Sequence, residues 1–263
     1  MNIRSARVLG AVAMAILMAA AGCDSGDPDA PAGQIGAPVS SALLDSLQAT
    51  SRQGLTRNVA SPAGVLQRIS GPPLGEDKPV ILYIGADYCP YCAALRWPLV
   101  LAMLRFGTFE DLRYMRSSSH DVYADTATFS FHGMHYHSDY LDFEAIDIAD
   151  RAGQPLDRPD DGQLAVFQKF DAAPYTNVPG AIPFLYIGGG YLQVGTFFTP
   201  DLLQGRSWRQ IADQSREARS SLSGPVMAAA NLYTAAFCSL TEQKPSDVCH
   251  SPAIEEASRH LPH

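Results

Sequence analysis

The stretch ILYIGADYCPYCAALRWPLVLAML, residues 81–104, decides the fold because its hydrophobic pattern changes in the middle. The run VILYIGA, residues 80–86, is continuously apolar, β-branched and aromatic, which is typical of a strand buried on both faces of a sheet. From Pro90 onward the apolar residues follow a helical spacing. Cys89 and Cys92 therefore lie where a central strand is expected to pass into a helix.

Two cysteines separated by two residues have three chemical interpretations: a redox dithiol, half of a zinc site, or a structural disulfide. The expected position at a helix N-terminus favours the first, because unpaired backbone N–H groups and the helix dipole stabilise a thiolate. Pro90 suits the first helical turn, and Cys92 lies about one turn further in. We therefore expect Cys89 to be the nucleophile and Cys92 the resolving thiol. Asp87 would tune this pair by raising the Cys89 pKa if its carboxylate pointed toward the thiol.

The zinc interpretation needs further ligands, and the dense candidates are the three histidines of FHGMHYH, residues 131–137. On a strand, His135 and His137 would share one face, so they are weak metal candidates. Histidines on a hairpin are more often simply exposed, and we expect no metal and no cofactor. A structural disulfide between Cys89 and Cys92 is disfavoured, because closing so short a loop removes little chain entropy.

The first 22 residues have the pattern of a secretory signal peptide. Two arginines precede an apolar stretch, residues 8–22, that is too short to span a bilayer comfortably and ends in small residues. The MAAAGC that ends at Cys23 resembles the lipobox of bacterial lipoproteins, although Ala20 stands where leucine is usual. This resemblance implies a lipid on Cys23; a non-lipidated export signal and an uncleaved anchor are the alternatives. Residues 23–40, rich in Gly, Pro and Asp, then form a flexible tether.

Charge and cysteine count narrow the class of protein further. The formal net charge is −8, and removal of the signal peptide makes it more negative, so nucleic acid and anionic lipid are not expected as partners. Disulfides persist outside the cytoplasm. If Cys23 carries lipid, the other four cysteines pair as Cys89–Cys92 and Cys238–Cys249. We interpret the second pair as a structural disulfide contributing about 2–3 kcal/mol, in preference to a second redox pair that relays electrons to the first.

The remaining pattern predicts alternating helices and strands, and therefore an α/β protein with a mixed sheet. After the N-terminal helical segment, residues 41–76, come the central strand and helix, and the pattern later predicts a turn near Gly133 and a hairpin turning at Gly188–Gly190. The other expected elements are a strand within 112–119, two or three strands within 121–148, a short helix at 163–170 and helices after Pro200.

Two segments resemble the thioredoxin superfamily. YIGADYCPYCAALRWPL, residues 83–99, is similar to its active-site segment: a strand, the C-P-Y-C motif, and a helix kinked by a proline. GAIPFLYIGG, residues 180–189, is similar to the segment that carries a cis-proline facing the dithiol. The resemblance implies that Pro183 is this proline and that Ile182, Pro90 and Tyr91 contact the bound polypeptide. An ordinary trans proline that starts an edge strand is the alternative for Pro183.

A closer similarity, to a bacterial and archaeal family called domain of unknown function 929, rests on FGTF, SSS.DVYADTATFSF and FCSLTEQKPSDVC. It implies fold and chemistry but no substrate. The expected fold class is thus a thioredoxin-like three-layer α/β sandwich over residues 77–200. It would contain a β-rich insertion at about 117–160, which lengthens the spacing from Cys92 to Pro183, and a helical C-terminal extension would follow at 201–263.

Together these features predict an extracytoplasmic, membrane-anchored thiol–disulfide oxidoreductase. Its expected partners are cysteine-containing exported proteins and an unidentified redox partner, with lipid on Cys23 as the membrane attachment. The direction of electron transfer is left open, because the oxidising periplasmic enzymes usually have histidine between the cysteines, where this chain has Pro90 and Tyr91. The alternative is a non-enzymatic binding lipoprotein that handles copper through the cysteines and histidines.

Overall fold

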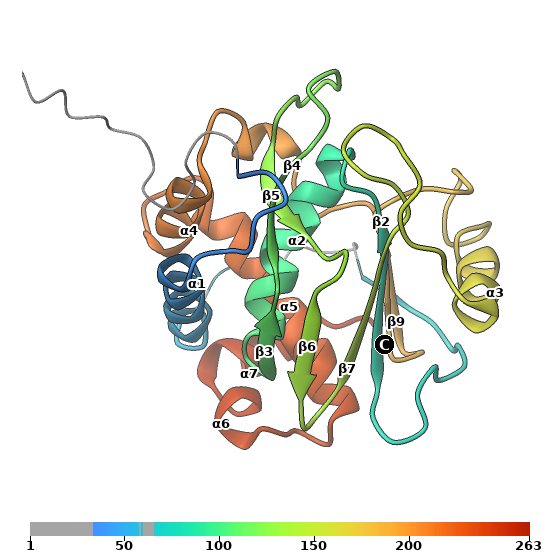
Figure 1. Ribbon diagram of the computed structural model, residues 1–263. Helices are drawn as coiled ribbons and strands as arrows, with labels where there is room; N and C mark the ends of the chain where they lie inside the picture. The colour runs from blue at the N-terminus through green and yellow to red at the C-terminus, as the bar shows by residue number, and fades with distance from the viewer. Residues whose placement is uncertain (1–33, 58, 60–65) are drawn as a thin grey trace, which may run out of the picture.

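The computed structural model describes residues 34–57, 59 and 66–263, and its centre is a mixed five-stranded sheet with helices on both sides (Figure 1). Strand β2 is parallel to β7 and antiparallel to β8, which confirms an α/β protein with a mixed sheet. The expected signal peptide, the lipidation site Cys23 and most of the tether lie outside the described residues. In sheet order the strands are β1 (Gln67–Arg68), β9 (Tyr191–Val194), β8 (Phe184–Ile187), β2 (Val80–Gly85) and β7 (Asp142–Asp147).

The central strand β2 supplies apolar side chains to both faces of the sheet. Ile81 and Tyr83 belong to the larger core, and Leu82 and Ile84 belong to a smaller core on the other face. Helix α3 (Asp161–Phe170), at the right of Figure 1, covers the smaller core. The alternation follows from the two-residue period of a strand, and it explains why the run at residues 80–86 has no polar position.

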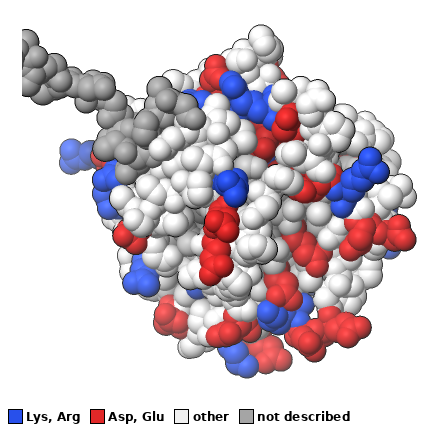
Figure 2. Space-filling view, viewed as in Figure 1, with Lys and Arg blue, Asp and Glu red and all other residues white. Residues whose placement is uncertain are grey.

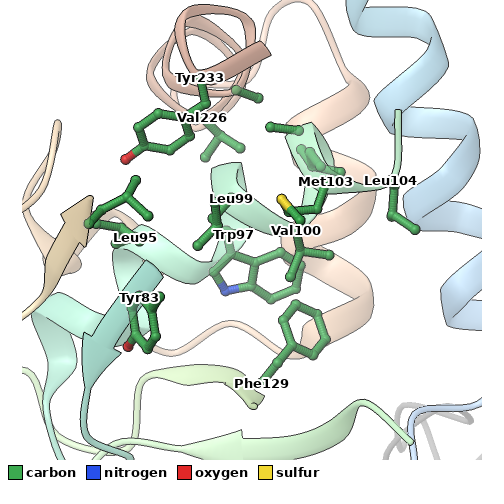
Figure 3. Close-up of a cluster of buried hydrophobic side chains, with 14 of the residues drawn as sticks. Tyr83, Leu95, Trp97, Leu99, Val100, Met103, Leu104, Phe129, Val226 and Tyr233 are labelled. Carbon is green, nitrogen blue, oxygen red and sulfur yellow. The ribbon is translucent and has the colours of Figure 1, made fainter. Parts of the chain in front are cut away.

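The larger core is built around α2 (Pro90–Met103), the helix that carries the cysteines. Every residue of α2 except Tyr91 is buried. Figure 3 shows the Trp97 ring against Phe129, with side chains of α5 (Ser223–Leu240) on the opposite side of α2. The Trp97 indole N–H also donates to the Ala127 carbonyl at 2.9 Å. The two cysteines thus lie at the start of a helix that is buried, apart from Tyr91, by the surrounding elements.

Two small antiparallel sheets lie beside the central one: β3 (Gly107–Glu110) with β6 (His135–Ser138), and β4 (Arg113–Arg116) with β5 (Ala127–Ser130). The chain turns at Gly133 with φ +73°, as expected, but β5 and β6 on either side of this turn pair with earlier strands and not with each other. The expected insertion at about 117–160 needs correction, because it includes β7, which lies in register beside β2 in the central sheet. The sequence pattern also missed β1 and β3.

The hairpin and the terminal helices agree with the sequence. Strands β8 and β9 are joined through Gly188 and Gly189, both with positive φ, which favours glycine. Ser40 caps the first helix, as its hydroxyl accepts a hydrogen bond from the Leu43 N–H. No described helix is both long and apolar enough to cross a membrane. The remaining elements are α1 (Ser41–Gly54), η1 (Pro200–Leu203), α4 (Trp208–Arg216), α6 (Ser246–Cys249) and α7 (Pro252–Ser258).

Arg105, just after α2, joins the N-terminal and C-terminal helices through the protein interior. Its guanidinium donates to the Ser51 carbonyl of α1 and to the Thr234 and Asn231 side chains of α5, at 3.2, 2.7 and 2.9 Å. Burial lowers the pKa of this arginine to about 9. Helices α1 and α5 are therefore parts of the same core as α2.

Candidate active site

The two cysteines lie where β2 ends and α2 begins. Cys89 is the N-cap residue of α2, with extended backbone angles, and its sulfur accepts a hydrogen bond from the Cys92 backbone N–H at 3.4 Å. Both cysteines are free thiols. Cys89 retains 7% of its surface exposed and Cys92 none, so a reactant reaches Cys89 first.

The pKa values of the two thiols move in opposite directions. Hydrogen bonding from the Cys92 thiol, followed by the backbone N–H groups of Cys92 and Tyr91 and the charge of Arg96, lowers the pKa of Cys89 to about 7 against the opposing effect of burial. Burial raises the pKa of Cys92 well above its ordinary value, and the hydrogen bond and charge of Cys89 add to this. One sulfur of the pair is thus favoured as the thiolate and the other as the thiol.

A buried arginine lies beneath the dithiol. Arg96 is one helical turn after Cys92 and therefore on the same face of α2. Its guanidinium lies 2.5 Å from Asp147 Oδ1 and 3.3 Å from Asp87 Oδ1, and all three side chains are almost completely buried. The Phe131 backbone N–H donates to the other Asp147 oxygen at 2.8 Å. Two carboxylates and one guanidinium thus form a buried charge cluster beside the sulfurs.

Asp87 belongs to this cluster. Burial raises its pKa to about 6, with the Arg96 guanidinium opposing and Asp147 adding to the rise. Its second oxygen accepts a hydrogen bond from the Ser130 hydroxyl at 3.0 Å. The electrostatic neighbour that shifts the Cys89 pKa is Arg96, which lowers it. The Asp87 carboxylate is buried and lies beside Arg96, whose positive charge acts on the thiol, so the tuning role expected for Asp87 stays a prediction.

Tyr83, on β2, places a hydroxyl against the buried sulfur. A Cβ added to Gly85 would lie 2.0 Å from the Tyr83 hydroxyl and 3.0 Å from Cys92 Sγ, so both atoms occupy the space that the glycine leaves. Burial raises the Tyr83 pKa well above its ordinary value, and Arg96 opposes this. The Arg96 guanidinium also lies over the Tyr83 ring, 5.5 Å from its centre. A protonated hydroxyl thus faces Cys92 with a cation behind it.

Sequence reasoning missed Arg96, Asp147 and Tyr83. The signal for Arg96 was present, since it is the one charged residue in the apolar run of residues 93–104. A charge in such a run needs a partner when it is buried. Asp147 could not be assigned as that partner, because β7 was not recognised as the neighbour of β2.

Pro183 lies at the same end of the sheet as the dithiol. The Ile182–Pro183 peptide bond is cis, as the resemblance implies. Because Phe184 of β8 pairs with Ile84 of β2, Pro183 stands beside the point where the chain leaves β2 toward Cys89. Within the described residues the Ile182 backbone forms no hydrogen bond, whereas the Pro183 carbonyl accepts one from the Gly195 N–H at 2.9 Å.

The other expected site residues are divided between this site and the surface. Pro90 is buried in the first turn of α2, and Tyr91 is 41% exposed with its ring edge against Tyr123 at 5.9 Å between centres. His135 and His137 lie on one exposed face of β6, and among the described residues no three His, Cys, Asp or Glu side chains are grouped so that they could hold a metal ion. His137 instead lies 3.3 Å from Glu110 on β3.

Cys238 and Cys249 form a disulfide, as the cysteine count predicts. The bond joins the end of α5 to the short helix α6, with 5.6 Å between the Cα atoms, and both residues are buried. It fixes the C-terminal helices.

Residues 68–169 match the model of a domain of unknown function (DUF929), a segment that runs from β1 into α3 and contains the two cysteines, Arg96, Asp87 and Asp147. No curated protein matches the chain. No solved structure matches it.

Proposed function

From the premise that residues 68–169 correspond to this uncharacterised family, we propose that the protein is a thiol–disulfide oxidoreductase that acts on protein cysteines through Cys89 and Cys92. The observation that carries the proposal is the opposite shift of the two thiol pKa values at a helix N-terminus. Cys89, at about 7, is substantially thiolate at neutral pH, and Cys92 is held as a thiol. Such a pair is suited to exchange.

In the reducing direction, the Cys89 thiolate attacks one sulfur of a substrate disulfide. The substrate S–S bond breaks, a mixed disulfide forms at Cys89, and the first substrate sulfur departs as a thiolate. Cys92 then loses its proton to that thiolate and attacks the Cys89 sulfur. The second substrate sulfur departs and takes a proton from solvent, so the substrate gains two electrons and the Cys89–Cys92 disulfide forms. The oxidising direction is the reverse sequence.

Arg96 and Tyr83 are positioning residues in this scheme. The second step places negative charge on Cys92, the sulfur that burial disfavours as an anion. The Arg96 charge lowers the Cys92 pKa, and the buried Tyr83 hydroxyl, which has no hydrogen-bond partner among the described residues, is close enough to donate to that sulfur once it becomes an anion. Asp87 and Asp147 hold the guanidinium in place.

The arrangement at the end of the sheet supports a thioredoxin-like form of this chemistry. A strand leads to the dithiol, a helix follows it, and Pro183 precedes the neighbouring antiparallel strand. We propose that the unpaired Ile182 backbone pairs with an extended segment of the substrate, as the resemblance implies. Export and attachment through lipid on Cys23 complete the proposal, supported by the signal-like sequence of residues 1–22.

Trapping of the intermediate tests this function. Full-length Cys92→Ser protein, mixed with a disulfide-containing polypeptide such as insulin, should accumulate a covalent adduct at Cys89, which peptide mass spectrometry locates. The Cys89→Ser protein is the matched control and should form none. Absence of an adduct in the first variant, or an adduct at another residue, would contradict the proposal.

Membrane attachment has its own test. Mass spectrometry of the N-terminal peptide of the protein isolated from the membrane fraction should find Cys23 as its first residue, with the added mass of a lipid on the cysteine. An N-terminal peptide that begins upstream of Cys23 would argue for the uncleaved anchor instead.

A further inference from the structure

Beside the dithiol the surface is hollowed. An open cavity of about 1070 Å³ lies between the β4–β5 connection and the loop after β7, and its wall on the active-site side is Tyr88, the neighbour of Cys89. The Ser118 N–H donates to the Tyr88 carbonyl at 2.8 Å, which ties the β4–β5 connection to the start of α2. In Figure 1 both loops project at the end of the molecule where α2 begins.

Tyr88 is near charged groups of both the dithiol and the hollow. Burial raises the Tyr88 pKa, and the charges of Cys89, Cys92 and Asp121 raise it further. The Tyr88 phenol is therefore near both the two sulfurs and Asp121, which lines the hollow together with Tyr88. A polypeptide whose cysteine reacts with Cys89 has its adjacent residues within reach of this cavity.

The hollow carries apolar groups that are otherwise scarce on the surface. The described residues include five large exposed hydrophobic side chains, and two of them, Ile35 and Val122, line the hollow at 41% and 81% exposure. A third, Tyr91, stands between the two cysteines and touches Tyr123 of the β4–β5 connection. Exposed apolar groups gathered beside a reactive sulfur mark a contact surface for an apolar side chain.

The negative charges in the hollow are not all balanced by ion pairs among the described residues. Arg151 is bound to the Asp125 carboxylate and to the Ser117 carbonyl, and the Asp150 carboxylate accepts two backbone N–H groups in its own turn. Asp121 is exposed, and in the described part of the chain it forms no ion pair. Figure 2 shows side chains of both signs gathered at this end of the molecule.

We propose that this hollow binds the residues next to the reacting cysteine of a polypeptide substrate, and that it selects a segment with an apolar side chain against Val122 and a basic side chain opposite Asp121. The inference rests on the proposed function and names its substrate class. The occupant is an extended peptide, because the site lies directly beside Cys89 and offers an unmatched carboxylate together with apolar contacts. The acidic charge of the chain, −8, adds long-range attraction for basic segments.

Binding is measured first, apart from redox chemistry. Fluorescent ten-residue peptides carry serine in place of cysteine, flanked by leucine and either arginine or glutamate, and their affinity for the full-length protein is read by anisotropy. The arginine peptide should bind roughly two- to fivefold more tightly, the range of a solvent-exposed ion pair. Asp121→Asn should abolish the difference, since asparagine retains the acceptor for the Val122 N–H and loses only the charge. The matched control is Asp139→Asn, an exposed aspartate in the β6–β7 turn at the opposite end of the molecule.

The second arm measures reaction rates with the same peptides carrying cysteine in a mixed disulfide with thionitrobenzoate, whose release is coloured. The arginine peptide should react faster by the same factor, and Asp121→Asn and Val122→Ser should leave the rate with dithiodipyridine, a small uncharged disulfide, unchanged. Equal binding of the two peptides by the wild-type protein, or a preference that survives Asp121→Asn, would overturn the inference. Failure of Cys89 to react with any disulfide, small or peptidic, would overturn the proposed function instead.

Discussion

The two cysteine pairs of this protein differ in separation and in surroundings. Cys89 and Cys92 are free, three positions apart, and lie at a helix N-terminus above a buried guanidinium. Cys238 and Cys249 are bonded, eleven positions apart, and join two C-terminal helices. A longer closed loop removes more entropy from the unfolded chain, so the second bond stabilises the fold, whereas we propose that the first pair undergoes exchange. Spacing and local charge together thus separate a reactive pair from a structural one.

The largest expected effect is on catalysis. Cys89→Ser should reduce insulin-disulfide reduction to the rate without enzyme, because serine is not a thiolate nucleophile. The Cys238→Ala/Cys249→Ala variant, assayed at a temperature where it is folded, should retain the wild-type rate per folded molecule. Loss of activity in the second variant would mean that the two pairs relay electrons and that the division between them is wrong.

The buried charge beneath the reactive pair gives the next effect. Arg96→Met should lower the free energy of unfolding by about 3–5 kcal/mol, because it leaves Asp87 and Asp147 buried without their cation. Arg105→Met is the matched control: it removes an equally buried guanidinium whose partners are all uncharged, and should cost about 1–3 kcal/mol. Urea denaturation measures both. An equal loss of unfolding free energy in the two variants would show that the effect of Arg96→Met does not come from leaving the two carboxylates without their cation.

The structural pair should contribute less than that cluster. Cys238→Ala/Cys249→Ala is expected to lower the free energy of unfolding by about 2–3 kcal/mol, the chain-entropy value for a loop of this size. Urea denaturation with and without a reducing agent measures it, and the wild-type protein under reduction should approach the variant. An unchanged midpoint in the variant would contradict the structural role.

The smallest effect is a pH dependence confined to the reactive pair. Since the Cys89 pKa is lowered to about 7, its thiolate fraction rises as pH rises through 7, and alkylation by iodoacetamide should accelerate about tenfold between pH 6 and 8. Cys92, whose pKa is raised, should stay unmodified over this range. Mass spectrometry of quenched samples gives both rates. A midpoint near pH 9 for Cys89 would contradict the role of the helix N-terminus and Arg96.

The local elements of this fold could be predicted because their signals are local. The uniform apolar run of β2, the proline that opens α2, and the Gly188–Gly190 turn each depend on a few neighbouring residues. The pairing of β7 with β2 depends on a long-range contact. These strands are separated by more than fifty residues, and nothing in either sequence identifies the other strand as its neighbour. The assignment of residues 117–160 to an insertion failed for this reason.

The same distinction holds for the site. Cys89, Cys92 and Pro183 were found because each occurs in a recognisable motif. The groups that bear on the two thiols, Arg96 and Tyr83, come from a helix interior and a strand interior, where a sequence pattern shows burial but not which atoms meet. The hollow beside Tyr88 is formed by two loops and was not predicted at all.

The enclosure of α2 also bears on how this protein can be produced in pieces. A chain cut to the family-matched segment, residues 68–169, would lack β8, the antiparallel neighbour of β2, and α5, which packs on α2. It would also leave the Arg105 guanidinium without its oxygen partners on both flanking helices. The shortest soluble expression product should therefore extend from α1 to α7, and the boundaries that a family catalogue draws around the dithiol are narrower than the unit that folds.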